Sequence, residues 1–199
     1  IAGFGKTLYA AYSDGIKIYD LTDPENPAQT GSISLYGPVR DLEVVGDRLY
    51  TASGNGIDIL KITVSGLTLE KQISTYGDTA VLKNWNGTII AGDGQGLKKV
   101  DTTTQEVVQQ VNTSGDISTL TIVDGIIHLY DWSGLKRYNA ETFNIVDTDS
   151  SYKNNPRITS HDGNIFITYS GNVYELTYNG TTPVYTQKTG DSNETADGY

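Results

Sequence analysis

Short runs of alternating apolar and polar residues, separated by turn residues, follow one another along the chain. Between residues 39 and 75 the sequence reads VRDLEVVG, RLYTASG, GIDILKIT and TLEKQIST, with Gly, Asp and Asn near the breaks. Runs of this length, rich in Val, Ile, Thr and Tyr, are typical of β-strands. No stretch of the sequence carries the sustained 3.6-residue apolar period of a helix. The pattern therefore predicts an all-β chain, with four short strands in this stretch.

The same pattern recurs five times. Segments that begin at residues 4, 45, 85, 123 and 161 align as FGKTLYAA, VGDRLYTA, WNGTIIAG, VDGIIHLY and HDGNIFIT, at spacings of 41, 40, 38 and 38 residues. Three columns of the alignment hold only apolar or aromatic residues. They lie four, twelve and fifteen positions after each start: Leu8, Leu49, Ile89, Ile127 and Ile165; Ile16, Ile57, Leu97, Leu135 and Val173; Tyr19, Leu60, Val100, Tyr138 and Leu176. A period near 40 residues with four strands is typical of a β-propeller blade.

We therefore predict a single five-bladed β-propeller over residues 1–199, with four antiparallel strands in each blade. One four-stranded sheet cannot bury both of its faces, whereas stacked blades can. The column three positions before each start holds Leu42, Leu82, Leu120 and Ile158, and Ile1 takes that place in the first repeat. Ile1 thus falls midway along an expected strand. We expect the C-terminal segment, residues 191–199, to pair beside that strand and complete the first blade.

The first repeats carry a more specific pattern. Residues 15–32 read GIKIYDLTDPENPAQTGS, and residues 36–60 read YGPVRDLEVVGDRLYTASGNGIDIL. Over about residues 5–60 this resembles the LVIVD-repeat and YVTN-like β-propellers, with an apolar strand ending in Asp followed by Thr-Asp-Pro-x-Asn-Pro. Pro24 and Pro27 suit a turn between strands. The later repeats lack this turn sequence. The resemblance implies a propeller of secreted or surface-anchored prokaryotic proteins and implies no shared catalytic motif.

The amino-acid composition excludes several classes of function. The 199-residue chain has no Cys, which excludes disulfides, thiolate metal sites and a cysteine nucleophile. Its net charge of −10 argues against nucleic acid, since phosphate binding needs a basic surface. No stretch is long and apolar enough to predict a membrane span, and residues 1–15 do not read as a signal peptide. Abundant Thr, Ser, Asn, Gly and Tyr favour an exported prokaryotic protein, so we expect an extracellular or cell-surface location.

Charged residues near the starts of the inner strands are the candidate binding residues. Asp78 and Asp116 share a column, each directly after a glycine where a strand begins. The full predicted set, at a channel mouth, is Arg40, Asp41, Asp78, Asp116, Arg157 and Asp197. Paired carboxylates can hydrolyse glycosidic bonds, whereas turn chemistry and a solvated channel mouth explain the same residues without catalysis. Carboxylate catalysis at this mouth therefore remains the alternative hypothesis.

Other polar motifs have simpler explanations. Both histidines, His128 and His161, occupy columns that hold large packing side chains elsewhere, so we expect structural roles and no catalytic triad. Trp85 is likewise predicted to pack, and Trp132 to be exposed. The acidic turns GDGQG (92–96) and DTDSS (147–151) do not complete a calcium loop, and we predict no metal and no cofactor. Four acceptor sequences for N-glycosylation lie near predicted turns, at Asn86, Asn112, Asn179 and Asn193.

These observations favour a non-enzymatic extracellular module that binds protein or carbohydrate at a prokaryotic cell surface. In one version the monomer closes its own propeller and a loop face binds the ligand. In the other, the C-terminal segment of one copy completes the first blade of the next, which builds a filament or layer. The alternative from another class is a carbohydrate-active hydrolase that uses the channel carboxylates.

Overall fold

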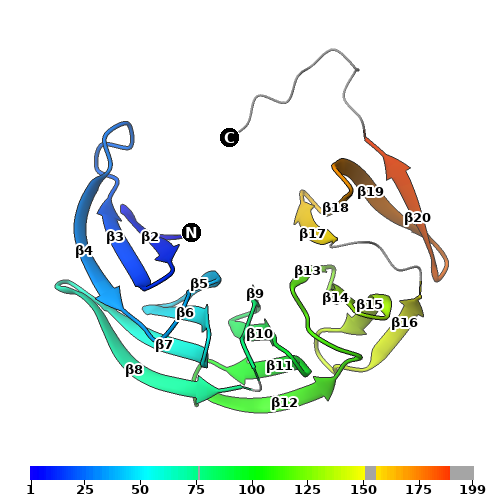
Figure 1. Ribbon diagram of the computed structural model, residues 1–199, viewed down its shortest axis with the longest axis horizontal. Coiled ribbons are helices and arrows are strands. Elements are labelled where there is room, and N and C mark those ends of the chain that lie inside the picture. The colour runs from blue at the N-terminus through cyan, green and yellow to red at the C-terminus, as the bar shows by residue number, and fades with distance from the viewer. Residues whose placement is uncertain (76, 151–155, 189–199) are drawn as a thin grey trace. The chain divides into compact units, whose positions relative to one another are not determined.

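The computed structural model describes residues 1–75, 77–150 and 156–188 and shows an all-β chain (Figure 1). The described residues form twenty strands in five four-stranded antiparallel sheets. The chain divides into two compact units, Ile1–Ser118 and Thr119–Tyr199, and each is described by itself. The predicted closure of the first blade by residues 191–199 lies outside the described residues.

The first unit holds three sheets, each built from consecutive strands. Sheet 1 is β1 (Ala2–Phe4), β2 (Thr7–Tyr12), β3 (Gly15–Asp20) and β4 (Ala28–Ser34). Sheet 2 is β5 (Asp41–Val45), β6 (Arg48–Ser53), β7 (Gly56–Thr63) and β8 (Gly66–Ser74). Sheet 3 is β9 (Val81–Trp85), β10 (Thr88–Gly92), β11 (Gly96–Asp101) and β12 (Glu106–Asn112). In Figure 1 the last strands, β4, β8 and β12, lie along one side of the unit. Each sheet is a simple meander, as the four-strand repeat predicts.

The second unit holds two sheets of the same kind. Sheet 4 is β13 (Thr119–Val123), β14 (Ile126–Asp131), β15 (Gly134–Asn139) and β16 (Ile145–Asp149). Sheet 5 is β17 (Arg157–His161), β18 (Asn164–Tyr169), β19 (Asn172–Asn179) and β20 (Thr182–Gln187). The pairing of the third and fourth strands shifts by one residue at the same column in sheets 1 to 4, for example between Arg137 and Tyr138. The repeat therefore fixes irregularities as well as strands.

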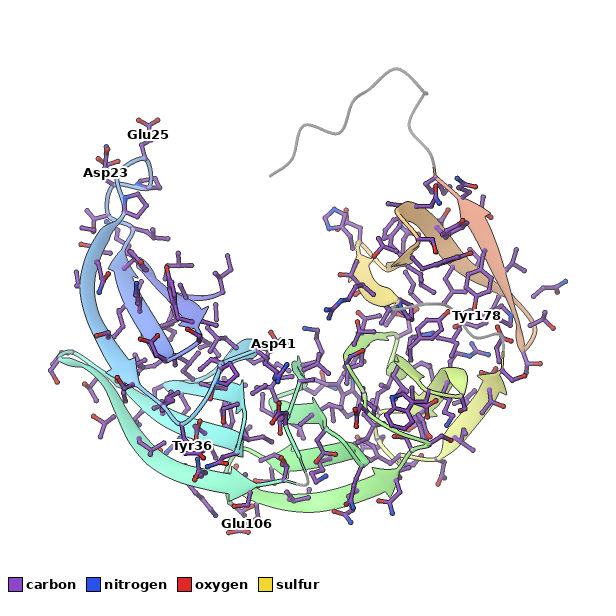
Figure 2. All side chains as sticks on the ribbon, in the orientation of Figure 1. Asp23, Glu25, Tyr36, Asp41, Glu106 and Tyr178 are labelled. Atoms are coloured by element: carbon purple, nitrogen blue, oxygen red, sulfur yellow. The ribbon has the colours of Figure 1, made fainter. Side chains whose placement is uncertain are left out.

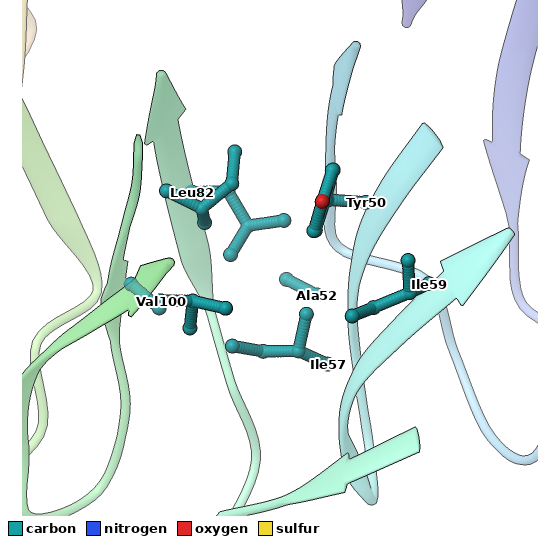
Figure 3. Close-up of a cluster of buried hydrophobic side chains, with 8 residues drawn as sticks. Tyr50, Ala52, Ile57, Ile59, Leu82 and Val100 are labelled. Atoms are coloured by element: carbon teal, nitrogen blue, oxygen red, sulfur yellow. The ribbon is translucent and has the colours of Figure 1, made fainter. Parts of the chain in front are cut away.

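Apolar side chains pack between consecutive sheets of each unit. Tyr50, Ala52, Ile57 and Ile59 of sheet 2 meet Leu82, Ile89, Ala91 and Val100 of sheet 3, and all are at most 1% exposed (Figure 3). Similar clusters lie between sheets 1 and 2 and between sheets 4 and 5. Because both faces of sheet 2 are covered, its strands β6 and β7 carry long runs of buried residues.

The predicted core columns are buried in the middle repeats and less so at the ends. Leu49, Ile57 and Leu60 of sheet 2 are 0% exposed. Val173 of sheet 5, by contrast, is 41% exposed, so its prediction as a core residue is wrong. Among the described residues of its unit, sheet 5 packs against sheet 4, and part of its other face has no cover from them.

A glycine begins the third strand of sheets 1 to 4 for a steric reason. Gly96 has φ +145°, and a Cβ there would lie 2.1 Å from the carbonyl oxygen of Val111 on the next strand. Only glycine avoids that overlap. The tight turn before Gly96 brings Asp93 to the end of the sheet, beside the segment that crosses to the next sheet.

Candidate functional site

Crossover segments and hairpin turns meet at one end of sheets 1 to 3. The crossovers link the last strand of one sheet to the first strand of the next, and each is tied to the preceding sheet by the same backbone hydrogen bond. Val39 N donates to Tyr12 O at 3.0 Å, Thr79 N to Ser53 O at 3.2 Å and Ile117 N to Asp93 O at 3.1 Å. This repeated bond places the residues beside the crossover glycines over the turns between the second and third strands.

A cavity of about 380 Å³ opens at this end, and we call it the crossover cavity. Its polar wall consists of Arg40, Asp78, Asp93 and Asp116, and the remaining residues are Gly77, Ala80, Gly94, Ile117 and Ser118. The small residues keep the space open. Three of the six predicted binding residues, Arg40, Asp78 and Asp116, therefore line one cavity.

Asp93 forms a rigid part of the cavity wall. It is 1% exposed, and its Oδ1 accepts hydrogen bonds from Gln95 N at 2.9 Å and Gly96 N at 3.0 Å. Its Oδ2 forms an ion pair with Lys98. A buried carboxylate is tolerated when it is paired and hydrogen-bonded in this way.

Sheet 4 repeats this arrangement. Asp131 accepts a hydrogen bond from Ser133 N at 2.8 Å and forms an ion pair with Lys136. The sequences DGQGLK and DWSGLK carry the pair at the same spacing. The sequence GDGQG by itself indicates only an acidic turn and does not identify Asp93 as a cavity residue. The signal that identifies it is the repeated Asp followed five residues later by Lys.

The charges in the crossover cavity are unevenly balanced. Arg40 forms an ion pair with Asp78, and both side chains are nearly half exposed. Lys98 balances Asp93. Within the described part of the chain, Asp116 is exposed and has neither a hydrogen bond nor an ion pair. The cavity therefore carries one uncompensated negative charge that is open to solvent.

Asp41 serves a structural purpose instead. Its Oδ2 accepts a hydrogen bond from Leu82 N at 2.9 Å and so ties β5 to β9, and its Oδ1 accepts one from Leu42 N at 3.0 Å. Figure 2 labels Asp41 on β5. Thr119 makes the equivalent tie in the second unit, where its Oγ1 accepts a hydrogen bond from Ile158 N at 3.0 Å. Asp41 does not line the crossover cavity.

The other predicted binding residues lie elsewhere. Arg157 is on β17 in the second unit, and Asp197 lies outside the described residues. Glu43, an inner-strand acid, faces sheet 3, where its Oε1 lies 3.7 Å from Lys83 Nζ. Burial raises the pKa of Glu43, and the nearby Lys83 opposes that shift.

The two histidines differ sharply. His128 is 4% exposed, and its Nδ1 lies 2.9 Å from Tyr178 Oη, as expected for a structural residue. Burial, together with the neighbouring charge of Arg137, lowers the pKa of His128 from 6.5 to about 4. The side chain of His161 is 82% exposed. Its prediction as a packing residue is wrong because its column lies at a strand end, where Phe4 is also 44% exposed.

The two tryptophans also differ in exposure. Trp132 is 68% exposed in the turn between β14 and β15, as predicted. Trp85 ends β9 and is only partly buried, with Lys99 Nζ 5.5 Å from its ring centroid. The prediction of Trp85 as a core residue is therefore wrong, and a cation–π contact covers one side of it.

Metal sites, membrane spans and glycosylation sites are the other kinds of feature to consider. In the described ranges no group of three or more His, Cys, Asp or Glu residues is placed to hold a metal ion. The described residues also include no helix long and apolar enough to cross a membrane. Asn86, Asn112 and Asn179 are exposed at turns or strand ends, where a glycan can be accommodated. Asn193 lies outside the described residues.

Comparison with known proteins identifies the fold. The structure is similar to a chain of the mitotic checkpoint complex (TM-score 0.74, 14% identity, 92% of this chain) and to the WD40 β-propeller domain of Doa1 (0.69, 14%, 86%). It is also similar to the WD40 domain of Toxoplasma gondii coronin (0.70, 13%, 92%). The fold is a β-propeller. Each four-stranded sheet is a blade, and the chain spans 60%, 60% and 57% of the lengths of these three structures.

The fold match does not extend to a family. No protein-family model matches the sequence, and no curated protein matches it. Membership of the LVIVD-repeat propellers therefore stays a prediction from residues 5–60.

Proposed function

We propose that this propeller is a non-enzymatic protein-interaction module of a prokaryotic cell surface and that its crossover cavity binds a basic side chain of a partner protein. The observation that carries the proposal is the exposed and unpaired carboxylate of Asp116 in a cavity of about 380 Å³. The similar structures include a chain from a multiprotein complex. Extracellular location rests on the composition and on the LVIVD-like residues of the first repeats.

The cavity suits a cation for two reasons. A lysine or arginine side chain entering it would form a charge-assisted hydrogen bond with Asp116, which is stronger than a neutral one. Asp78, although paired with Arg40, offers a second carboxylate at the wall. Asp93 and Asp116 lie in the same wall, so the cavity disfavours an anion. The net charge of −10 also attracts basic partners over a longer range.

A peptide panel tests this proposal. Fluorescence anisotropy would compare labelled peptides of one sequence that carry Lys, Ala or Glu at the central position. We expect the Lys peptide to bind most tightly, with an affinity that falls as salt rises. Asp116→Asn should weaken its binding by about tenfold. The matched control is Asp162→Asn, which removes the same charge from an exposed residue outside the cavity. Equal loss in both variants, or no preference for Lys, would overturn the proposal.

A second mode of interaction is strand addition between copies. β1 pairs with Thr7, Leu8 and Tyr9 of β2, whereas β5 pairs with five residues of β6. Residues 10 and 11 of β2 thus have no strand partner on that side within the described part of the chain, and Tyr12 O accepts a hydrogen bond from Val39 N of the crossover. We propose that residues 191–199 of another copy pair with this stretch of β2. Light scattering would show large particles that disappear when residues 191–199 are deleted. Monomers of the full chain would rule this mode out.

One observation favours the hydrolase alternative: Asp78 and Asp116 do line the same cavity. Both carboxylates are exposed, and Asp78 is already paired with Arg40, so neither has the apolar surroundings that keep a general acid protonated. Hydrolysis of any member of a glycan panel, lost in Asp78→Asn and Asp116→Asn, would establish the enzyme. We expect no hydrolysis.

A further inference from the structure

Sheet 4 presents a row of four polar residues to sheet 5. Thr121, His128, Arg137 and Asp147 pair in register across β13 to β16. At the places that His128 and Arg137 take in this row, sheet 2 has Tyr50 and Ile59, which are 0% exposed among apolar neighbours. A buried polar row costs free energy unless its groups are satisfied. The hydrogen-bond partners of this row therefore need to be identified.

Sheet 5 satisfies most of the polar row. Thr121 Oγ1 lies 2.7 Å from Ser160 Oγ, and His128 Nδ1 lies 2.9 Å from Tyr178 Oη. The guanidinium of Arg137 lies 3.7 Å from the ring centroid of Tyr178 and donates to Asp147 Oδ1 at 2.7 Å. Figure 2 labels Tyr178, on β19. The imidazole of His128 is therefore held in one orientation by its Nδ1 contact.

The second nitrogen of that imidazole is not completely buried. Within the described residues, His128 Nε2 has no hydrogen-bond partner, and the only fully enclosed side-chain polar atom without a partner is Tyr50 Oη. Part of the Nε2 surface is therefore accessible, although the residue as a whole is 4% exposed. His128 lines a cavity of about 280 Å³ between sheets 4 and 5, which we call the His128 cavity.

Charge and size restrict what the His128 cavity can hold. Arg137 is paired with Asp147, and Glu175 lies 2.6 Å from Lys188 Nζ, so these two lining charges are balanced. The third charged lining residue, Asp124, is exposed and has neither an ion pair nor a hydrogen bond within the described part of the chain. The cavity wall therefore carries one uncompensated negative charge. Hydrogen-bonding groups remain on the wall at Asn164 and Thr177. The volume equals that of about nine water molecules. It falls just below the roughly 300–1,000 Å³ of sites for drug-sized ligands.

We propose that the His128 cavity binds a polyhydroxylated ligand of monosaccharide size that carries no negative charge, with His128 Nε2 as a hydrogen-bonding contact. A sugar hydroxyl both donates and accepts hydrogen bonds, so it can satisfy Nε2 in either tautomer. The unpaired carboxylate of Asp124 can accept hydrogen bonds from hydroxyl groups and disfavours an anionic ligand. This site is independent of the crossover cavity, because its residues all belong to sheets 4 and 5.

Histidine NMR provides the test, because the chain has only two histidines. Protein with labelled histidine rings would be titrated with glucose, glucosamine and glucuronate, which share a ring and differ in charge. We expect saturable shifts of the His128 ring with glucose, at a dissociation constant on the order of 1 mM, and no shift of His161. Binding of glucuronate as tight as that of glucose, or an unmoved His128 ring with all three sugars, would overturn the proposal.

Two variants separate binding from folding. His128→Phe keeps an aromatic ring, as Phe166 does at the same column of sheet 5, and should weaken glucose binding by about tenfold in calorimetry. Thr177→Val changes an exposed strand residue with little effect on the fold and should weaken binding by roughly threefold. His161→Gln should bind glucose as the natural chain does. Glucose binding unchanged in Thr177→Val and in folded His128→Phe would overturn the proposal.

Discussion

The buried hydroxyl of Tyr50 offers a sharp test of the packing between sheets 2 and 3. The Tyr50 side chain is 0% exposed and lies against Ile59 and Leu82 (Figure 3). Its Oη is the only buried side-chain nitrogen or oxygen without a hydrogen-bond partner in the described part of the chain. Burial also raises the pKa of Tyr50, so the group stays a neutral phenol at ordinary pH. Tyr50→Phe should therefore stabilise the protein.

The magnitude follows from two opposing effects. A buried hydroxyl without a partner costs roughly 1–3 kcal/mol of desolvation, and Tyr50→Phe removes that cost. The substitution also removes the dispersion contacts of one oxygen atom, at about 0.1–0.2 kcal/mol for each contact. The net result is a gain of about 1 kcal/mol in the free energy of unfolding. For a chain of this size that gain raises Tm by about 2–4 °C.

Urea unfolding followed by circular dichroism would measure this change, with Tyr130→Phe as the matched control. Tyr130 Oη lies 3.1 Å from Tyr185 Oη, which itself donates to Asp149 Oδ2 at 3.1 Å. The same chemical change there breaks a hydrogen-bond chain and should cost about 1 kcal/mol. A loss of stability in Tyr50→Phe as large as in Tyr130→Phe would refute the reasoning, because Tyr50 Oη would then have a partner.

Three further predictions concern stability. The pKa of His128 is about 4 in the folded chain and 6.5 when unfolded, so only the unfolded chain gains that proton as pH falls from 6.5 to 4. Up to about 3 kcal/mol of the stability present above pH 6.5 is therefore lost over this range. Unfolding measured at several pH values should show this loss in His161→Gln but not in His128→Phe. Asp41→Ala leaves Leu82 N without its acceptor and should cost about 2 kcal/mol in urea unfolding; an unchanged midpoint would contradict the proposed tie between β5 and β9. Gly96→Ala places a methyl group 2.1 Å from a carbonyl oxygen, so its Tm should fall by several degrees, and an unchanged Tm would contradict the steric account.

The fold was predictable from sequence because strands and turns are local. Alternation with period two sets the strands, and five aligned copies average out accidental residues. The wrong predictions of buried residues concern side chains whose exposure depends on their position within the sheet. His161 and Trp85 share a column with Phe4, Val45 and Val123, but that column lies at a strand end, where water reaches it.

The site was predictable only in part for a related reason. Asp78 and Asp116 share a column directly after the crossover glycine, so the repeat itself places them at one end of the sheets. The carboxylate of Asp41 is held by a hydrogen bond from the backbone N–H of Leu82 in the next sheet. No pattern within one repeat reveals that contact. Asp93 enters the cavity wall through a turn whose partner, Lys98, becomes evident only when two repeats are compared.

The side-chain carboxyl carbons of the aspartates provide the most direct test of the proposed function. Their NMR signals would be followed while a lysine-containing peptide is titrated into the folded chain. We predict that Asp116 shifts most and Asp78 next, because both line the crossover cavity, while Asp41 and Asp162 do not move. Equal shifts at Asp162, or shifts confined to aspartates outside the cavity, would contradict the assignment of this cavity as the binding site.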